Sequence, residues 1–143
     1  MTIAEKKQAL LAQLSAIKNS QERFAHLISL ARQQPPLEPE FKTDAYRVEG
    51  CLAKLWFVAT FRDGRCYFRT DSDSAIVKSV AALLADFYSG QTPKEILTTD
   101  PSFLETVGIS QHLTQNRRNS LGKVWEKIRA FAGAHADPEH AGT

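Results

Sequence analysis

The spacing of apolar residues divides the chain into a helical first third, a short extended middle and a helical second half. From Ile3 to Ile17, and again after Asn19, apolar side chains return every three or four residues, as they do on one face of an α-helix. Asn19 with Glu22 three residues later is a helix-start signal, and Pro35-Pro36 predicts the end because proline has no backbone N–H. The polar segment from Leu37 to Glu49 is expected on the surface.

From Leu55 the apolar period changes to two residues, which is typical of a half-buried β-strand. Asp63-Gly64 favours a two-residue hairpin turn, because both turn positions tolerate positive φ. Such a turn places Phe61 opposite Cys66 and continues outward along both strands. One face of the hairpin is then apolar, and we expect it to face the core: Leu55, Phe57, Ala59, Phe61, Cys66 and Phe68.

Helix signals then follow one another along the second half of the chain. Asp71-Ser72-Asp73-Ser74 supplies turn and cap residues for an amphipathic helix that ends at Gly90. Thr92-Pro93-Lys94-Glu95 is a capping box with proline at the first helical position. Asp100-Pro101 repeats the cap-and-proline arrangement for a short helix through Val107.

A last helix is predicted from about Gln115 to Ala132, and the tail from Ala134, which contains Asp137-Pro138, is predicted to be disordered. We therefore expect one α+β domain over residues 1–133 and a tail over 134–143. In this domain helices pack on one side of a small antiparallel sheet.

Composition and charge exclude several classes of protein. The 143 residues are 43% hydrophobic and 24% charged, with 18 Lys and Arg against 16 Asp and Glu. This balance lacks the concentrated basic character of a nucleic-acid-binding domain. No apolar run approaches the roughly 18 residues of a transmembrane helix. The amino terminus resembles an amphipathic helix rather than a secretory signal, so we predict a cytoplasmic protein without membrane contact.

The two cysteines, Cys51 and Cys66, have different surroundings in the sequence. Cys66 falls on the apolar face of a predicted strand, where a buried thiol acts as a small hydrophobic group. Cys51 follows Gly50, which suggests a turn, and on the residues alone either a structural or a chemical role stays open. An extended strand would separate the thiols by up to about 30 Å, whereas a disulfide requires Cα atoms within about 7 Å. We therefore expect any chemistry at Cys51 to involve a single thiol and a partner protein.

Other catalytic patterns are weak. The histidines lack metal-ligand spacing, and no glycine-rich phosphate loop or nucleophile elbow occurs, so we predict no metal and no bound cofactor: His26, His112, His135 and His140. His112 could act as a base for Cys51, although packing or capping at a helix end is favoured. The basic residues of the last helix, beginning at Arg117, are either a solvated face or a surface for an acidic partner.

Four segments together resemble the SufE/CsdE family of sulfur-acceptor proteins. Each is short, but they occur in the family's order and spacing, and the likeness covers about residues 5 to 132. They are Val48-Glu49-Gly50-Cys51 with Trp56, Asp71 to Lys78 (DSDSAIVK), Thr92 to Leu97 (TPKEIL), and His112-Leu113-Thr114 with Arg117 and Asn119. The chain departs from the family's usual residues at Ala53, Ser79 and Ser120, and Ala53 lacks the hydroxyl that often lies near the cysteine.

The resemblance implies that Cys51 accepts sulfane sulfur as a persulfide from a pyridoxal-phosphate cysteine desulfurase and stimulates that enzyme. The chain would then pass the sulfur to an iron–sulfur scaffold or another acceptor, as an accessory protein rather than an enzyme. It also implies a fold like that of the scaffold proteins. The pyridoxal phosphate belongs to the partner, and we expect a monomer or weak homodimer.

The sequence also supports predictions about the reactivity of the Cys51 thiol and about the movement of its loop. Glu49 lies near Cys51 and the nearest cation in sequence is Lys54, so we expect modest reactivity until the desulfurase docks. The free protein is expected to place Cys51 against apolar side chains, and docking to move the Val48–Ala53 loop outward.

Charged residues around the loop are the remaining candidates. We expect Gly50 to shape the loop, Asp71 and Asp73 to lie beside it, and Lys78 and Arg117 to flank it. Helix capping would explain the two aspartates equally well. A non-catalytic regulatory module and a nucleic-acid-binding last helix remain the alternatives to sulfur transfer.

Overall fold

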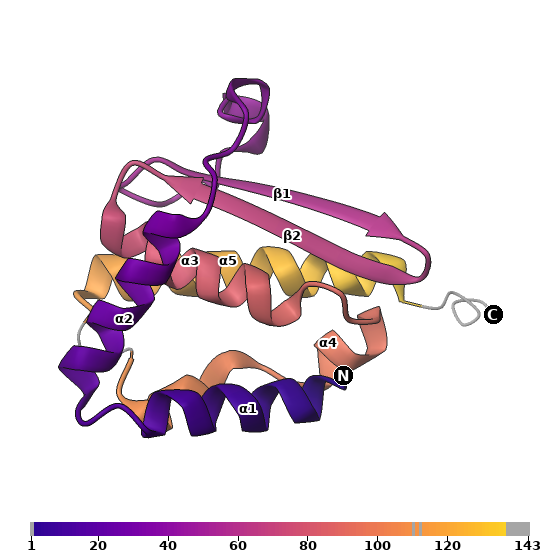
Figure 1. Ribbon diagram of the computed structural model, residues 1–143. Coiled ribbons are helices and arrows are strands. Elements are labelled where there is room, and N and C mark those ends of the chain that lie inside the picture. The colour runs from indigo at the N-terminus through magenta and orange to yellow at the C-terminus, as the bar shows by residue number, and fades with distance from the viewer. Residues whose placement is uncertain (1, 110, 112, 137–143) are drawn as a thin grey trace.

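The computed structural model describes residues 2–109, 111 and 113–136. Its helices gather on one side of a long β-hairpin (Figure 1). In chain order the elements are α1 (Ile3–Ser15), α2 (Ser20–Gln33), the 3₁₀ helices η1 (Pro39–Phe41) and η2 (Asp44–Tyr46), β1 (Leu55–Arg62), β2 (Arg65–Ser72), α3 (Ala75–Tyr88), α4 (Pro93–Thr98), the 3₁₀ helix η3 (Pro101–Val107) and α5 (Gln115–His135).

The hairpin has the predicted turn and register. Asp63 and Gly64 have φ values of 54° and 79°, the positive values that a two-residue turn of this type requires. Phe61 pairs with Cys66, and the antiparallel register continues to Leu55 opposite Ser72. Within the described residues β1 and β2 form a two-stranded sheet.

The helices form layers beneath this sheet, as predicted for the α+β fold. α3 lies along β2 and α5 lies under β1, while α2 and α1 pack on the far side of α3 (Figure 1). Aromatic rings join the layers: Phe68 of β2 meets Phe131 of α5 at 5.8 Å, and Tyr88 of α3 meets Trp125 of α5 at 5.0 Å. The core therefore lies between the hairpin and the helices. On the other face of the sheet, Val58 and Asp71 are also buried, and Leu37 and Lys42 from the segment before β1 contact Asp71.

The predicted helix starts at Asn19 and Thr92 are confirmed. The Asn19 side chain accepts a hydrogen bond from the Glu22 N–H at 2.9 Å, and Thr92 forms a reciprocal capping box with Glu95. α3 begins after Ser74, whose hydroxyl accepts from the backbone of the first turn. Among the described residues, no helix combines the length and apolarity needed to cross a bilayer.

The far end of the hairpin differs from the prediction at two points. Phe61 is 42% exposed rather than part of the core, since it lies one residue before the end of β1, next to the hairpin turn. Its ring stacks on His135 at 4.6 Å, and the same imidazole lies 4.2 Å from the Phe131 ring. These contacts support a last turn of α5 that runs to His135, beyond the predicted end at Ala132. A disordered tail from residue 134 is therefore wrong for its first residues, and residues 137–143 lie outside the described part.

The segment between α2 and β1 follows the surface only in its middle. η1 and η2 form an arm that projects above the sheet (Figure 1), and within it the rings of Phe41 and Tyr46 meet edge to face at 5.2 Å. Leu37 and Val48, at the two ends of the arm, are buried. These two anchors fix the direction in which the chain enters the loop before β1.

Candidate functional site

Residues 49–53, the Cys51 loop, lie at the end of the sheet where β1 begins and β2 finishes (Figure 1). The ends of this loop are fixed to the frame. The Val48 N–H donates to the Leu55 carbonyl at 2.8 Å, which closes the base of the loop. On its far side the Lys54 N–H donates to Asp73 Oδ1 at 3.0 Å, and the Asp73 N–H donates back to the Lys54 carbonyl at 3.2 Å.

The tip of the loop is held by side-chain packing. Gly50 has φ of +86°, the left-handed region that favours glycine. A Cβ at Gly50 would lie 3.2 Å from Cε of Lys123, so a lysine from α5 covers this residue. Cys51 is half-buried and packs against the hydrophobic core, whereas Leu52, the next residue, is 80% exposed. The loop thus turns its sulfur inward and its leucine outward.

Cys66 has the structural environment that the sequence predicts. It is fully buried in β2, and burial raises the pKa of its thiol to about 11. Its N–H donates to the Gln91 carbonyl at 2.9 Å and its carbonyl accepts from the Gly90 N–H at 2.8 Å. Both cysteines are free thiols. Of the two, only Cys51 lies where another protein could reach it.

Asp71, next to the last residue of β2, is a buried carboxylate, 2% exposed. Oδ2 accepts from the Leu37 N–H at 3.1 Å and pairs with Lys42 at 3.1 Å. Oδ1 accepts from the Ser72 N–H at 2.8 Å and lies 3.5 Å from Lys78. Burial alone would raise the pKa of Asp71, but these hydrogen bonds and lysine charges outweigh it and lower the pKa. Asp71 therefore joins the end of β2 to the first turns of α3, through Lys78, and to the segment after α2, through Leu37 and Lys42.

The aspartates do not cap α3. Ser74 is the N-cap residue, and its hydroxyl accepts from the Val77 N–H at 3.3 Å. Asp73 is exposed and uses its carboxylate on the Lys54 N–H, so it holds one end of the Cys51 loop. The capping alternative for Asp71 and Asp73 is thus wrong, because Asp71 lies within β2 and Ser74, not Asp73, occupies the N-cap position of α3.

Arg117 comes to the loop from the first turn of α5. It lines a hollow together with Leu52 and Ala53 of the loop and the first turn of α3. Sequence reasoning placed Gly50, Cys51, Asp73 and Arg117 around one loop, and the structure brings them together.

Two neighbours of the cysteine carried no sequence signal. Lys123 is one of several basic residues of α5, and only the crossing of α5 beneath the loop brings it to Gly50. The exposure of Leu52 is equally invisible in the sequence, since its place after a cysteine does not fix its direction. Sequence spacing within a helix or a strand cannot predict such contacts between distant segments.

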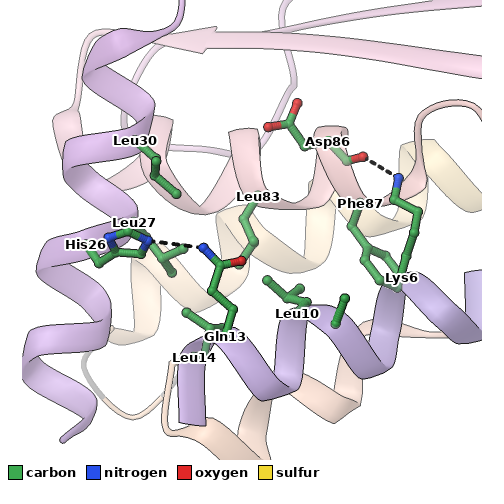
Figure 2. Close-up of a pocket in the computed structure, with 11 residues that line it drawn as sticks. Lys6, Leu10, Gln13, Leu14, His26, Leu27, Leu30, Leu83, Asp86 and Phe87 are labelled. Carbon is green, nitrogen blue, oxygen red and sulfur yellow. Dashed lines mark hydrogen bonds between the residues drawn. The ribbon is translucent and has the colours of Figure 1, made fainter. Parts of the chain in front are cut away.

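A second concavity lies on the opposite side of α3, between α1 and α2 (Figure 2). Its volume is about 290 Å³ and its lining is mostly apolar. At one end Lys6 Nζ donates to the Asp86 carbonyl at 2.9 Å, and at the other Gln13 and His26 lie 3.4 Å apart (Figure 2). This groove contains neither cysteine, and it is separated from the Cys51 loop by α3.

His112, for which the sequence favours packing or capping over a role as a base for Cys51, lies outside the described residues. Across residues 2–109, 111 and 113–136, no three side chains of His, Cys, Asp or Glu come together in a way that could hold a metal ion.

These features define the class: a small α+β protein that presents one half-buried cysteine on a clamped loop at the end of a hairpin. The model of the SufE family, described as an Fe–S metabolism associated domain, matches residues 8–132. The chain therefore belongs to the SufE family and is associated with Fe–S metabolism.

Relatives support the assignment. The chain is 31% identical over 111 residues to an uncharacterized SufE-like protein of Synechocystis sp., covering 78% of this chain and 70% of that protein. It is 32% identical over 117 residues to SufE-like protein 1, chloroplastic/mitochondrial, of Arabidopsis thaliana, covering 81% of this chain but 32% of the longer plant protein. The fold matches the solution structure of a hypothetical protein from Thermus thermophilus with a TM-score of 0.74 and 21% identity, over 91% of this chain and 95% of that one.

Proposed function

We propose that this chain accepts sulfane sulfur on Cys51 from a pyridoxal-phosphate cysteine desulfurase, stimulates that enzyme and passes the sulfur on for iron–sulfur cluster assembly. The observation that carries the proposal is the position of Cys51. In a chain of the SufE family, it is the half-buried thiol on a loop, whereas Cys66 is sealed in the core.

The chemistry is a thiol–persulfide exchange. The Cys51 thiolate attacks the outer sulfur of the persulfide on the desulfurase cysteine, forming a new S–S bond. The bond between the two donor sulfurs breaks, and the desulfurase cysteine leaves as a thiolate that takes up the proton lost by Cys51. A thiolate of the next acceptor repeats the exchange at Cys51. The transferred sulfur keeps its oxidation state, so these steps require no reductant.

The geometry of the Cys51 loop suits both halves of this cycle. Packing of Cys51 against the core shields a bound persulfide from stray thiols while the protein is free. The hydrogen bonds at Val48 and Lys54 hold the ends of the loop, so that its tip can swing outward without loss of the frame. We expect the outward movement when the desulfurase docks, because Cys51 packs partly against the core in the free protein and its sulfur must become fully accessible for the exchange.

The remaining expectations are part of the proposal. The pyridoxal phosphate belongs to the desulfurase, the downstream partner is a cluster scaffold or another sulfur acceptor, and the chain acts as a monomer or weak homodimer. Its cytoplasmic location stays a prediction. In the competing proposal the domain regulates its partner without carrying sulfur, and Cys51 is then an ordinary loop residue.

Mass spectrometry after incubation with desulfurase and cysteine tests the proposal. The parent chain is expected to gain the mass of one sulfur, reversed by a reducing agent. Cys51→Ser is expected to gain none, while Cys66→Ala retains the gain. Alanine is the better control at position 66, because serine would bury a hydroxyl without a partner. Sulfur retained by Cys51→Ser would end the proposal, and full stimulation by an unlabelled Cys51→Ser would favour the regulatory module.

A further inference from the structure

Leu52 is the most exposed large hydrophobic residue in the described part of the chain. It is 80% exposed, whereas the other exposed leucines, Leu30 and Leu97, are 41% and 43% exposed. A single exposed leucine is common on protein surfaces and by itself indicates nothing. Leu52 is of interest because of its position, directly after the cysteine that we propose as the sulfur carrier.

We propose that Leu52 is the apolar anchor by which the cysteine desulfurase recognises the Cys51 loop. The proposal rests on the function given above and adds the residue that determines partner binding. A desulfurase that delivers sulfur to Cys51 must enclose the adjacent residue, and enclosing Leu52 removes its apolar surface from water. A pocket lined by apolar side chains at the mouth of the desulfurase active site is the complementary surface.

Cys51 packs inward and Leu52 projects outward, and this difference determines which of the two residues the partner contacts first. In the free protein the leucine projects into solvent while the sulfur packs inward. The partner can therefore bind Leu52 before Cys51 leaves its shelter. Because Val48 and Lys54 are fixed, the tip moves as a unit, and drawing Leu52 into a pocket also draws Cys51 out. Binding and exposure of the sulfur are coupled through adjacent residues.

Charges around the loop define the rest of the partner surface. Cations outnumber acids among the side chains that border the loop: Lys54, Arg117 and Lys123 against Glu49 and Asp73. We therefore expect the apolar pocket of the desulfurase to have acidic groups at its rim. Complementary rim charge mainly affects the rate of association, while the buried apolar anchor mainly affects the rate of dissociation.

The test uses a desulfurase that the parent chain stimulates, with alanine production measured against the concentration of the chain. Leu52→Ala is expected to raise the half-saturating concentration about tenfold, because the truncation removes most of the apolar side chain that docking on the desulfurase would bury. The maximal rate is expected to stay within about twofold. Leu97→Ala, on α4, removes a similar side chain at the opposite end of the molecule and is expected to change neither value. Leu52→Met is expected to restore most of the binding.

The outcomes separate this inference from the proposed function. If Leu52→Ala half-saturates the desulfurase at the parent's concentration, or lowers only the maximal rate, Leu52 is not an anchor, although Cys51 can still carry sulfur. If the parent chain gains no sulfur from any desulfurase, the proposed function fails and the anchor fails with it. Since Leu52 is exposed, its substitution leaves the thermal stability unchanged, and thermal unfolding verifies this for every variant.

Discussion

The two cysteines of this chain belong to one hairpin region but to different kinds of structure. Cys66 lies inside β2, fully buried, with its backbone N–H and carbonyl both bonded to the segment after α3. Cys51 lies on a loop whose ends are bonded and whose tip rests on side-chain packing. The same side chain is thus part of the frame in one place and part of a movable tip in the other.

The difference shows what a sulfur carrier requires. A thiol that exchanges sulfur must be sheltered between transfers and must come out during them, so it needs a segment that moves while its surroundings stay fixed. The backbone bonds of Cys66 tie it to Gln91 and Gly90, and freeing it would break the core. Cys51 lies outside both strands and packs against the core while only half-buried, so its movement leaves the sheet and the bonded loop ends in place. Secure loop ends are therefore as important to the site as the cysteine itself.

The largest expected effect is the difference in alkylation between the two thiols. In the native protein at pH 8, iodoacetamide is expected to modify Cys51 at least about a hundredfold faster than Cys66, because Cys66 reacts only when the core opens. Its raised pKa of about 11 further lowers its thiolate fraction at that pH. Peptide mapping by mass spectrometry measures both rates. In denaturant the two rates are expected to converge, and comparable rates in the native state would contradict the assignment of roles.

Asp71→Asn tests the buried carboxylate at the end of β2 and is expected to lower the free energy of unfolding by about 2–3 kcal/mol at pH 7. An amide presents only one oxygen, so it cannot accept from Leu37, Ser72 and both lysines as the carboxylate does. The variant is expected to increase alkylation of Cys66 through more frequent opening, with little change at Cys51. Urea unfolding gives the free energy, and Glu105→Gln, an exposed carboxylate, is the control.

The pH dependence of stability tests whether the charge of Asp71 stabilises the folded protein. The folded-state pKa of Asp71 is lowered, so its contribution to stability is fully present above the unfolded pKa of about 4. This contribution is lost as the pH falls through the folded-state pKa. The difference between parent and Asp71→Asn is therefore expected to shrink from pH 5 toward pH 2. A difference that stays constant over this range would mean that the Asp71 charge does not stabilise the frame.

The features that could be predicted from the sequence are those fixed by residues close together in the chain. The Asp63-Gly64 turn fixes the hairpin register by itself, and Thr92 fixes the start of α4, because both act through nearby backbone groups. The half-buried position of Cys51 against the core was also predicted correctly.

Contacts between distant segments were not predicted. Sequence reasoning placed Asp71 beside the Cys51 loop or at a helix cap, whereas Leu37, Lys42 and Lys78 enclose it as a buried carboxylate. The approach of Lys123 to Gly50 and the stacking of Phe61 on His135 likewise depend on where α5 lies beneath the hairpin. Periodicity predicts which face of an element is apolar, but not where that element ends relative to its neighbours.

The smallest expected effect compares two glycines with similar backbone angles. Gly50 has φ of +86° and Gly64 has φ of +79°, so alanine is strained at both positions. Gly64→Ala, in the tight turn of the hairpin, is expected to lower the free energy of unfolding by about 1–2 kcal/mol and to leave alkylation of Cys51 unchanged. Gly50→Ala is expected to cost less than this, since the loosely held tip can shift to relieve the strain.

That shift has a measurable consequence at the cysteine. The new Cβ at position 50 would lie 3.2 Å from Lys123 Cε, and nothing lies within 4 Å of the equivalent position at Gly64. Displacement of Lys123 and of the tip is expected to raise the alkylation rate of Cys51 about two- to fivefold, while Cys66 is unaffected. In the double variant Gly50→Ala/Lys123→Ala the new Cβ no longer meets a lysine. Its Cys51 alkylation rate is therefore expected to approach that of the single variant Lys123→Ala. If Gly50→Ala instead lowers stability as much as Gly64→Ala and leaves Cys51 reactivity unchanged, the tip is part of the rigid frame, and the contrast between the two thiols rests on exposure alone.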